Sequence, residues 1–195
     1  MNSMVGKIAL VTGGSRGIGR ACALALAQEG ADVAVNFRER QDAAREVCSL
    51  LERAGRRSLP VQADVSKSSE VGRMVKAVEQ ELGTIEILVN NAGIARRYPW
   101  DQIPEEGWDE IMATNLKSAY LVTQAVLPGM RARGHGRIGN ADIGDPEFSR
   151  VQASGHQQMA KFPAAKSDGF AGRDGRALHL AQLRLDHPVL DFAQL

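Results

Sequence analysis

Short apolar runs alternate with longer amphipathic stretches along the first two thirds of the chain. The runs have the length of buried strands, and the stretches between them carry apolar residues three and four positions apart, as one face of a helix does. Strands are predicted at Ile8–Val11, Val33–Phe37, Ser58–Gln62 and Ile87–Val89. Strands that alternate with helices of this length predict right-handed βαβ crossovers around a parallel sheet.

Glycines follow the predicted helices where a helix commonly ends. Gly30, Gly55 and Gly83 each come directly after a helical pattern, and glycine accepts the left-handed conformation of such an end without strain. Ser68 is predicted to cap the helix that follows it, and a longer helix is predicted from Trp108 to Met130. The predicted fold class is α/β, a doubly wound parallel sheet of Rossmann-like type.

A glycine-rich turn directly follows the first predicted strand. It reads Thr12-Gly-Gly-Ser-Arg-Gly-Ile-Gly19 and runs into a helix. Glycines at this spacing let the backbone approach a pyrophosphate, whose charge the helix N-terminus favours. The pattern predicts dinucleotide binding, with a chance glycine-rich loop as the alternative. The loop residues predicted to bind the cofactor are Gly13, Ser15, Arg16, Gly17, Ile18 and Gly19.

The residues after the second predicted strand bear on the choice of cofactor. At this place an acidic residue binds the ribose hydroxyls of NAD, whereas an arginine accommodates the extra phosphate of NADP. The chain has Arg38 here and Arg16 in the facing loop, and a guanidinium suits bidentate phosphate contact. NADP(H) is the predicted cofactor. Glu39 argues against it, and solvated surface arginines are the alternative interpretation.

Composition narrows the class of protein. The 195 residues carry a net charge of +1, which offers no basic field for nucleic acid. No stretch approaches the roughly 20 apolar residues of a membrane span, and no signal peptide is expected. The only cysteines, Cys22 and Cys48, lack metal or dense disulfide spacing, so a reduced, cytoplasmic setting without a metal site is predicted.

Four motifs in order resemble the short-chain dehydrogenase/reductase family, and most closely its bacterial 3-oxoacyl-acyl-carrier-protein reductase type. They are the glycine loop, Asp64-Val65, Asn90-Asn91-Ala92-Gly93 and Asn115, within residues 5–138. The resemblance implies that Asp64 and Val65 border the adenine. It also implies that Asn91, Ala92 and Gly93 hold the ribose side and brace the sheet, although a simple strand-ending turn would have the same composition.

Asn115 is the catalytic residue that the resemblance implies. The matching family residue distorts its helix and holds a water in a proton relay. Asn115 also lies on an apolar stripe with Trp108, Ile111 and Val122, so its carboxamide is expected to be buried and to need hydrogen-bond partners. The alternative is that it only satisfies a local backbone carbonyl.

The family pattern ends after Ile138. The continuation Gly139-Asn-Ala-Asp-Ile143 has turn character, and Pro146 disfavours a central strand. Residues 1–138 are therefore predicted to form an incomplete dinucleotide-binding domain, with C-terminal strands missing or replaced, and 139–195 an irregular tail with one short helix. Without a fifth strand, Ile87–Val89 is expected to be an open, apolar sheet edge that lowers stability.

The family's catalytic set is also missing at its expected positions. Its spacing places the Ser, Tyr and Lys at Ile143, His156 and Ala160, and the near match Phe162…Lys166 lacks a hydroxyl. The sequence therefore predicts an NADPH-dependent reductase of a small carbonyl substrate, a 3-oxoacyl thioester or similar, with impaired catalysis. The alternatives are a silent NADP-binding or subunit-interaction module, which pairs through its long helix with a copy or a full-length relative, and a frameshifted product.

Overall fold

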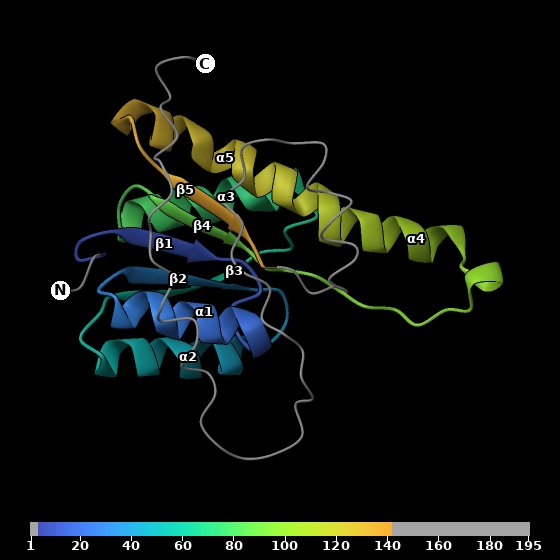
Figure 1. Cartoon of the computed structure of the whole chain (residues 1–195), viewed down its shortest axis with the longest axis horizontal. Helices are drawn as coiled ribbons and strands as arrows, with labels where there is room; N and C mark the ends of the chain where they lie inside the picture. Colours follow the sequence, from blue (N-terminus) through green and yellow to red (C-terminus); the bar gives the residue numbers. More distant parts are fainter. Residues whose placement is uncertain (1–3, 142–195) are drawn as a thin grey trace.

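The computed structural model describes residues 4–141. Its parallel strands form one sheet in the order β3-β2-β1-β4-β5, with helices on both faces (Figure 1). The strands are β1 (Ile8–Val11), β2 (Asp32–Phe37), β3 (Ser58–Gln62), β4 (Ile87–Asn90) and β5 (Arg137–Asn140). The predicted doubly wound parallel sheet is confirmed.

Helices alternate with the strands as the sequence predicts. α1 and α2 lie on one face of the sheet and α3 and α5 on the other, while α4 projects beyond the sheet (Figure 1). The α-helices are α1 (Gly17–Gln28), α2 (Gln41–Arg53), α3 (Ser68–Glu81), α4 (Glu105–Met112) and α5 (Ser118–Arg133). A short 3-10 turn spans Trp100–Gln102, and a π-helical segment, Ala113–Lys117, joins α4 to α5. The predicted long helix is therefore present, with a change of helix type inside it.

The sheet is buried on both faces. Ile8 and Leu10 of β1 pack into the core on the side of α3 and α5, whereas Ala9 and Val11 pack toward α1 and α2. Alternate residues of a strand point to opposite faces, so a strand covered on both sides must be apolar throughout. This accounts for the short uninterrupted apolar runs.

The predicted glycine ends of three helices are confirmed, but the predicted cap at Ser68 is wrong. Gly30, Gly55 and Gly83 have φ of +101°, +76° and +114°, a region that disfavours other residues. Ser68, however, is the first helical residue of α3 and no side chain caps this helix. Glu70 instead reaches back and accepts a hydrogen bond from the backbone N–H of Asp64 at 2.8 Å, so the entry into α3 is fixed from inside the helix.

The predicted loss of the fifth strand is wrong. β5 pairs in parallel with β4 from Arg137 to Asn140, and the Ala141 N–H continues the ladder to the carbonyl of Asn90 at 2.8 Å. Ladder bonds join backbone groups, so a paired neighbour outweighs the weak strand propensity of Gly139 and Asn140. β4 is therefore an interior strand and not an open edge. The predicted tail helix and the positions assigned to the missing Ser, Tyr and Lys lie outside the described residues.

A buried carboxylate joins the amino ends of β1, β4 and β5. Glu86, which precedes β4, is 7% exposed. One of its oxygens lies 3.1 Å from Lys7 Nζ and 2.7 Å from His135 Nε2, and the other 3.6 Å from Arg133. Burial opposes ionisation, but hydrogen bonds from His135 and Lys7 and the charges of both hold the pKa of Glu86 below its usual value. The carboxylate is therefore ionised and ties three strands together.

Candidate functional site

The predicted cofactor residues gather where the strand order reverses. β2 and β3 lie on one side of β1, while β4 and β5 lie on the other. In open parallel sheets the crevice at such a switch point, beyond the carboxyl ends of the strands, is the usual ligand site. The glycine loop after β1 and the segment after β4 both begin there.

The glycine loop has the backbone geometry of an anion site. Gly13 and Gly17 have φ of +62° and +55°. α1 begins at Gly17, after an extended Arg16, and no side chain caps it and no acid stands in its first turn. The first N–H groups of a helix have no partner within the helix. This N-terminus is therefore left for an anionic group that approaches the loop.

Thr12 links the glycine loop to the segment after β4. Its hydroxyl accepts hydrogen bonds from the backbone N–H of Asn91 at 2.9 Å and of Ala92 at 3.0 Å. The Asn91 side chain in turn donates to the carbonyls of Thr12 at 2.8 Å and Gly13 at 3.1 Å. The sheet-bracing role implied for Asn91 thus matches its contacts, and the two loops form one unit.

Asn36 joins the end of β2 to the same unit. It is 2% exposed and accepts a hydrogen bond from the Gly13 N–H at 3.2 Å. Its amide donates to carbonyls of the neighbouring strand end, Val61 at 3.3 Å and Ala63 at 3.1 Å. The Asn36 side chain therefore organises the loops from within. The next exposed side chains after β2 are those of Arg38 and Glu39.

Replacement of Gly19 by Ala is expected to disrupt the loop. A Cβ at Gly19 would collide with the Asn91 amide nitrogen and approach the Gly13 carbonyl oxygen to 2.5 Å. Relief must move backbone of the glycine loop, so we expect a lower unfolding midpoint and at least about tenfold weaker nucleotide binding. Gly72→Ala is the matched control, because it meets open space in helix α3 and should stabilise by roughly 0.5–1 kcal/mol. Equal nucleotide affinity of both variants, measured by calorimetry, would contradict the expectation.

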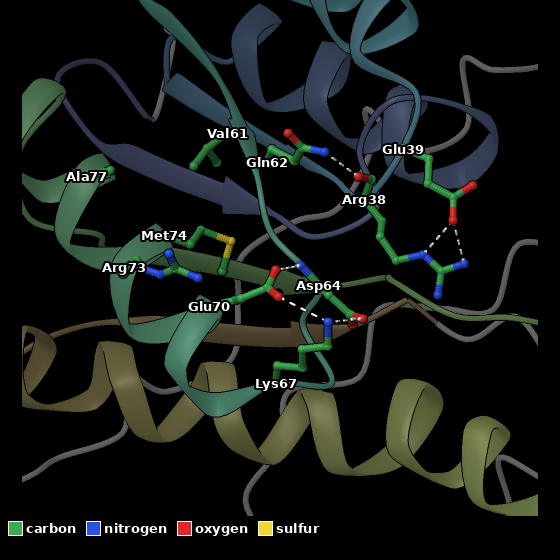
Figure 2. A pocket seen from close by; sticks show the side chains of 10 residues that line it. All are labelled: Arg38, Glu39, Val61, Gln62, Asp64, Lys67, Glu70, Arg73, Met74 and Ala77. Carbon is green, nitrogen blue, oxygen red and sulfur yellow. Dashed lines mark hydrogen bonds and ion pairs between the residues drawn. The ribbon is translucent and has the colours of Figure 1, made fainter. Parts of the chain in front are cut away.

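An open pocket of about 720 Å³ adjoins the ends of β2 and β3 (Figure 2). Arg38 lines it and is ion-paired with Glu39 at 2.8 Å, while the Arg38 backbone carbonyl accepts a hydrogen bond from Gln62 at 2.8 Å. Arg16 lies exposed in the glycine loop. Its guanidinium has no recorded partner within residues 4–141. The two arginines thus differ, since Arg16 is free and Arg38 is engaged.

Asp64 is one of the residues that line this pocket, and Val65 next to it is buried. The Asp64 carboxylate accepts hydrogen bonds from the Ser66 N–H at 3.0 Å and the Ser66 hydroxyl at 2.6 Å. Partial burial raises the pKa of Asp64, but the Ser66 bonds and the charges of Lys67 and Arg38 outweigh it and keep this pKa low. Asp64 is thus a fixed negative charge at the predicted adenine edge.

Asn115 lies in the π-helical segment and is exposed, so its expected burial is wrong. Trp108 of the same predicted stripe is 49% exposed too, and its helix α4 projects past the sheet (Figure 1). The Asn115 amide does have hydrogen-bond partners, as predicted, and they are backbone groups of the segment after β4. Asn115 Oδ1 accepts from the Ile94 N–H at 2.8 Å, and Nδ2 donates to the Ile94 carbonyl at 2.9 Å. The distorted helix turn is thereby attached to the segment after β4.

Sequence reasoning missed several polar side chains around the site. Arg96 forms a bidentate ion pair with Glu110 of α4, at 3.2 and 3.0 Å. Asn90, which is 8% exposed, donates to Thr123 and Asn140, while its Oδ1 has no partner among the described residues. Thr12 and Asn90 stand in the sequence motifs, but the sequence assigned neither of them a role; a polar residue at the end of an apolar strand was the available signal. Nothing local marks the Arg96–Glu110 pair.

The comparisons with known proteins agree with this geometry. The family model described as short chain dehydrogenase matches residues 7–142. The chain belongs to the short-chain dehydrogenase family. It is 40% identical over 161 residues to a 3-oxoacyl-[acyl-carrier-protein] reductase of Staphylococcus epidermidis, covering 83% of this chain and 64% of that protein. It is 41% identical over 150 residues to gluconate 5-dehydrogenase of Gluconobacter oxydans, covering 76% and 57%.

A solved structure supports the same family assignment. A Sinorhizobium meliloti protein assigned to the short-chain alcohol dehydrogenases matches with a TM-score of 0.69 and 37% identity, over 78% of this chain and 62% of that one. The chain thus spans less than two thirds of the length of these relatives. The chain is therefore a homologue of the oxidoreductases of the short-chain dehydrogenase/reductase family.

Two further features of residues 4–141 complete the description. No group of His, Cys, Asp and Glu in this part of the chain could hold a metal ion. No helix there is long and apolar enough to cross a bilayer. The site is thus described by its loops, its ion pairs and the pocket at the ends of β2 and β3.

Proposed function

We propose that the chain binds NADP(H) and is, by family, a reductase of a small carbonyl compound such as a 3-oxoacyl thioester. The observation that carries the cofactor choice is the pair of exposed arginines, Arg16 in the glycine loop after β1 and Arg38 after the neighbouring strand β2. The relative named a 3-oxoacyl-[acyl-carrier-protein] reductase supports the substrate class.

The residues present fit a nicotinamide dinucleotide. The uncapped start of α1 suits a pyrophosphate, and Gly19 leaves room where a Cβ would collide with the loop. In our proposal the dinucleotide contacts the glycine loop, Asp64 and Val65 at the adenine, and Asn91, Ala92 and Gly93 at the ribose side. When bound, the cofactor supplies the hydride for carbonyl reduction.

The chain's own residues position these groups and offer limited proton chemistry. Asn115 holds the segment after β4 at Ile94 and would orient a water for the relay. Carbonyl reduction also needs an acid near the developing alkoxide. The family's Tyr and Lys positions carry His156 and Ala160, and we therefore propose that catalysis is impaired while cofactor binding is retained.

The cofactor preference can be tested by calorimetry with NADPH and NADH. The loss of one charged phosphate contact is expected to weaken binding by about tenfold to a hundredfold. Arg38→Gln and Arg16→Gln should each weaken NADPH binding with little effect on NADH. Arg131→Gln, an exposed site in the last turn of α5, is the matched charge control. Equal affinity for the two cofactors, or tighter NADH, would refute the preference.

A second candidate function is a silent subunit-interaction module. Three large side chains from α4 to α5 are exposed, namely Trp108 at 49%, Leu116 at 50% and Tyr120 at 60%. Leu116 and Tyr120 also line an open hollow of about 560 Å³. Large side chains exposed together favour a protein contact, here with a second copy of the chain that presents the same helix. Measured turnover separates this candidate from the enzyme.

We also propose a cytoplasmic setting. Cys22 and Cys48 are both free. Burial raises the pKa of each thiol, so both stay protonated and poorly reactive. Two unpaired thiols, one buried and one partly buried, suit a reducing compartment.

A further inference from the structure

The pocket beside β2 and β3 is balanced in charge. Its cationic lining residues are Arg38, Lys67 and Arg73, and its anionic ones are Glu39, Asp64 and Glu70. Figure 2 shows Arg38 and Glu39 together at one end of this pocket, with Lys67 close to Asp64 and Glu70. Arg38 is ion-paired with Glu39, and Lys67 with Asp64 and Glu70. A ligand phosphate that approaches either cation therefore meets a carboxylate already bound to it.

The three carboxylates differ in how firmly they are held. Asp64 is fixed by Ser66, and Glu70 accepts hydrogen bonds from the Asp64 N–H and from Lys67 Nζ at 3.2 Å. The Glu39 side chain is 74% exposed, and Arg38 is the partner recorded for its carboxylate. Glu39 is therefore the carboxylate that can leave for solvent at small cost.

The backbone of Arg38 is held by Gln62 of the neighbouring strand β3, whereas its side chain is held by the exposed Glu39. Gln62 fixes the Arg38 carbonyl, whereas the guanidinium is bound by Glu39 through both Nε at 3.0 Å and a terminal nitrogen at 2.8 Å. A phosphate needs these same donors, because guanidinium binds phosphate and carboxylate with one donor geometry. Glu39 and a phosphate therefore compete for Arg38.

We propose that Glu39 sets cofactor discrimination by competing with the ribose 2′-phosphate for Arg38. This rests on the proposed NADP(H) site and adds to it a residue that weakens the binding of the phosphorylated cofactor alone. A cofactor with a free 2′-hydroxyl leaves the Arg38–Glu39 pair intact. Glu39 thus reduces the difference in affinity between NADP(H) and NAD(H) that Arg16 and Arg38 create.

The test uses 2′,5′-ADP and 5′-AMP, which report the adenosine end of the site without the nicotinamide. For the full chain, Glu39→Gln should strengthen 2′,5′-ADP binding about two- to fivefold, the range of an exposed ion pair, and leave 5′-AMP unchanged. Glu81→Gln is the control for net charge, since Glu81 is exposed at the end of α3. In an Arg38→Gln background, Glu39→Gln should have no effect, because the competition is gone.

The outcomes separate the two proposals. If the wild type binds 2′,5′-ADP more tightly than 5′-AMP, and Glu39→Gln does not strengthen 2′,5′-ADP binding, the role of Glu39 is overturned and the cofactor preference stands. If the wild type binds 2′,5′-ADP and 5′-AMP equally, and Glu39→Gln binds 2′,5′-ADP more tightly, the cofactor preference is overturned and the competition is supported. Equal gains in Glu39→Gln and Glu81→Gln, or a gain that persists without Arg38, overturn the competition, since net charge would explain them.

Discussion

The chain is expected to reduce acetoacetyl-CoA with NADPH about 10²–10⁴-fold more slowly than its full-length relative from Staphylococcus epidermidis, the usual contribution of a positioned acid. The alkoxide that forms on carbonyl reduction needs a proton donor, and His156 and Ala160 stand where family spacing places Tyr and Lys. The rate of NADPH oxidation, followed by absorbance for both proteins under one condition, measures the difference.

Cofactor binding on the same sample is the necessary control, because it separates a missing acid from an unfolded site. Phe162→Tyr tests the near match Phe162…Lys166, and we expect no recovery of turnover from it. Wild-type reduction at about 1 per second or faster would show that another residue supplies the proton. The chain would then be an ordinary reductase and not a silent module.

The parts of the fold that follow from local pattern were predictable. β1 and β3 match their predicted bounds, because apolar runs of this length flanked by polar turns have few other solutions. Three glycines follow helix ends for an equally local reason, because their φ is positive: Gly30, Gly55 and Gly83. Each signal lies within a few residues of the feature that it predicts.

The misses share a different cause, which is pairing between distant segments. β5 depends on β4, which lies far earlier in the chain, and the bond between Asn90 and Asn140 joins their ends. His135 lies between α5 and β5, and its partner Glu86 is far away in sequence, so no local pattern could mark the contact. Asn115 was predicted to be buried because it shares the spacing of an apolar helix face. That spacing does not show that α4 projects beyond the sheet and leaves part of this face exposed (Figure 1). The cofactor roles themselves stay predictions.

Replacement of Glu86 by Gln is expected to be the most costly of the single changes for stability. Glu86 is 7% exposed, and its carboxylate contacts Lys7, Arg133 and His135. The amide removes the negative charge that binds Lys7 and Arg133 and accepts the hydrogen bond of His135, at a cost of about 2–3 kcal/mol for hydrogen bonds to a charged group. For a chain of this size we expect an unfolding midpoint lower by roughly 5–10 °C. The same Glu81→Gln control should change it little.

The pH dependence of stability identifies the charge itself as the cause. The pKa of Glu86 is lowered in the folded protein, so the unfolded chain takes up the proton first as pH falls. The stabilisation is therefore complete well above the unfolded pKa of about 4.3 and is lost progressively below it, down through the folded pKa. Glu86→Gln should remove this part of the acid sensitivity and leave a shallower curve, measured by denaturant unfolding from about pH 7 toward about pH 3. An unchanged slope in the acid range, with stability still lost at neutral pH, would mean that the Glu86→Gln variant is weakened through packing, and that the cluster around Glu86 does not hold β5 to the sheet by charge.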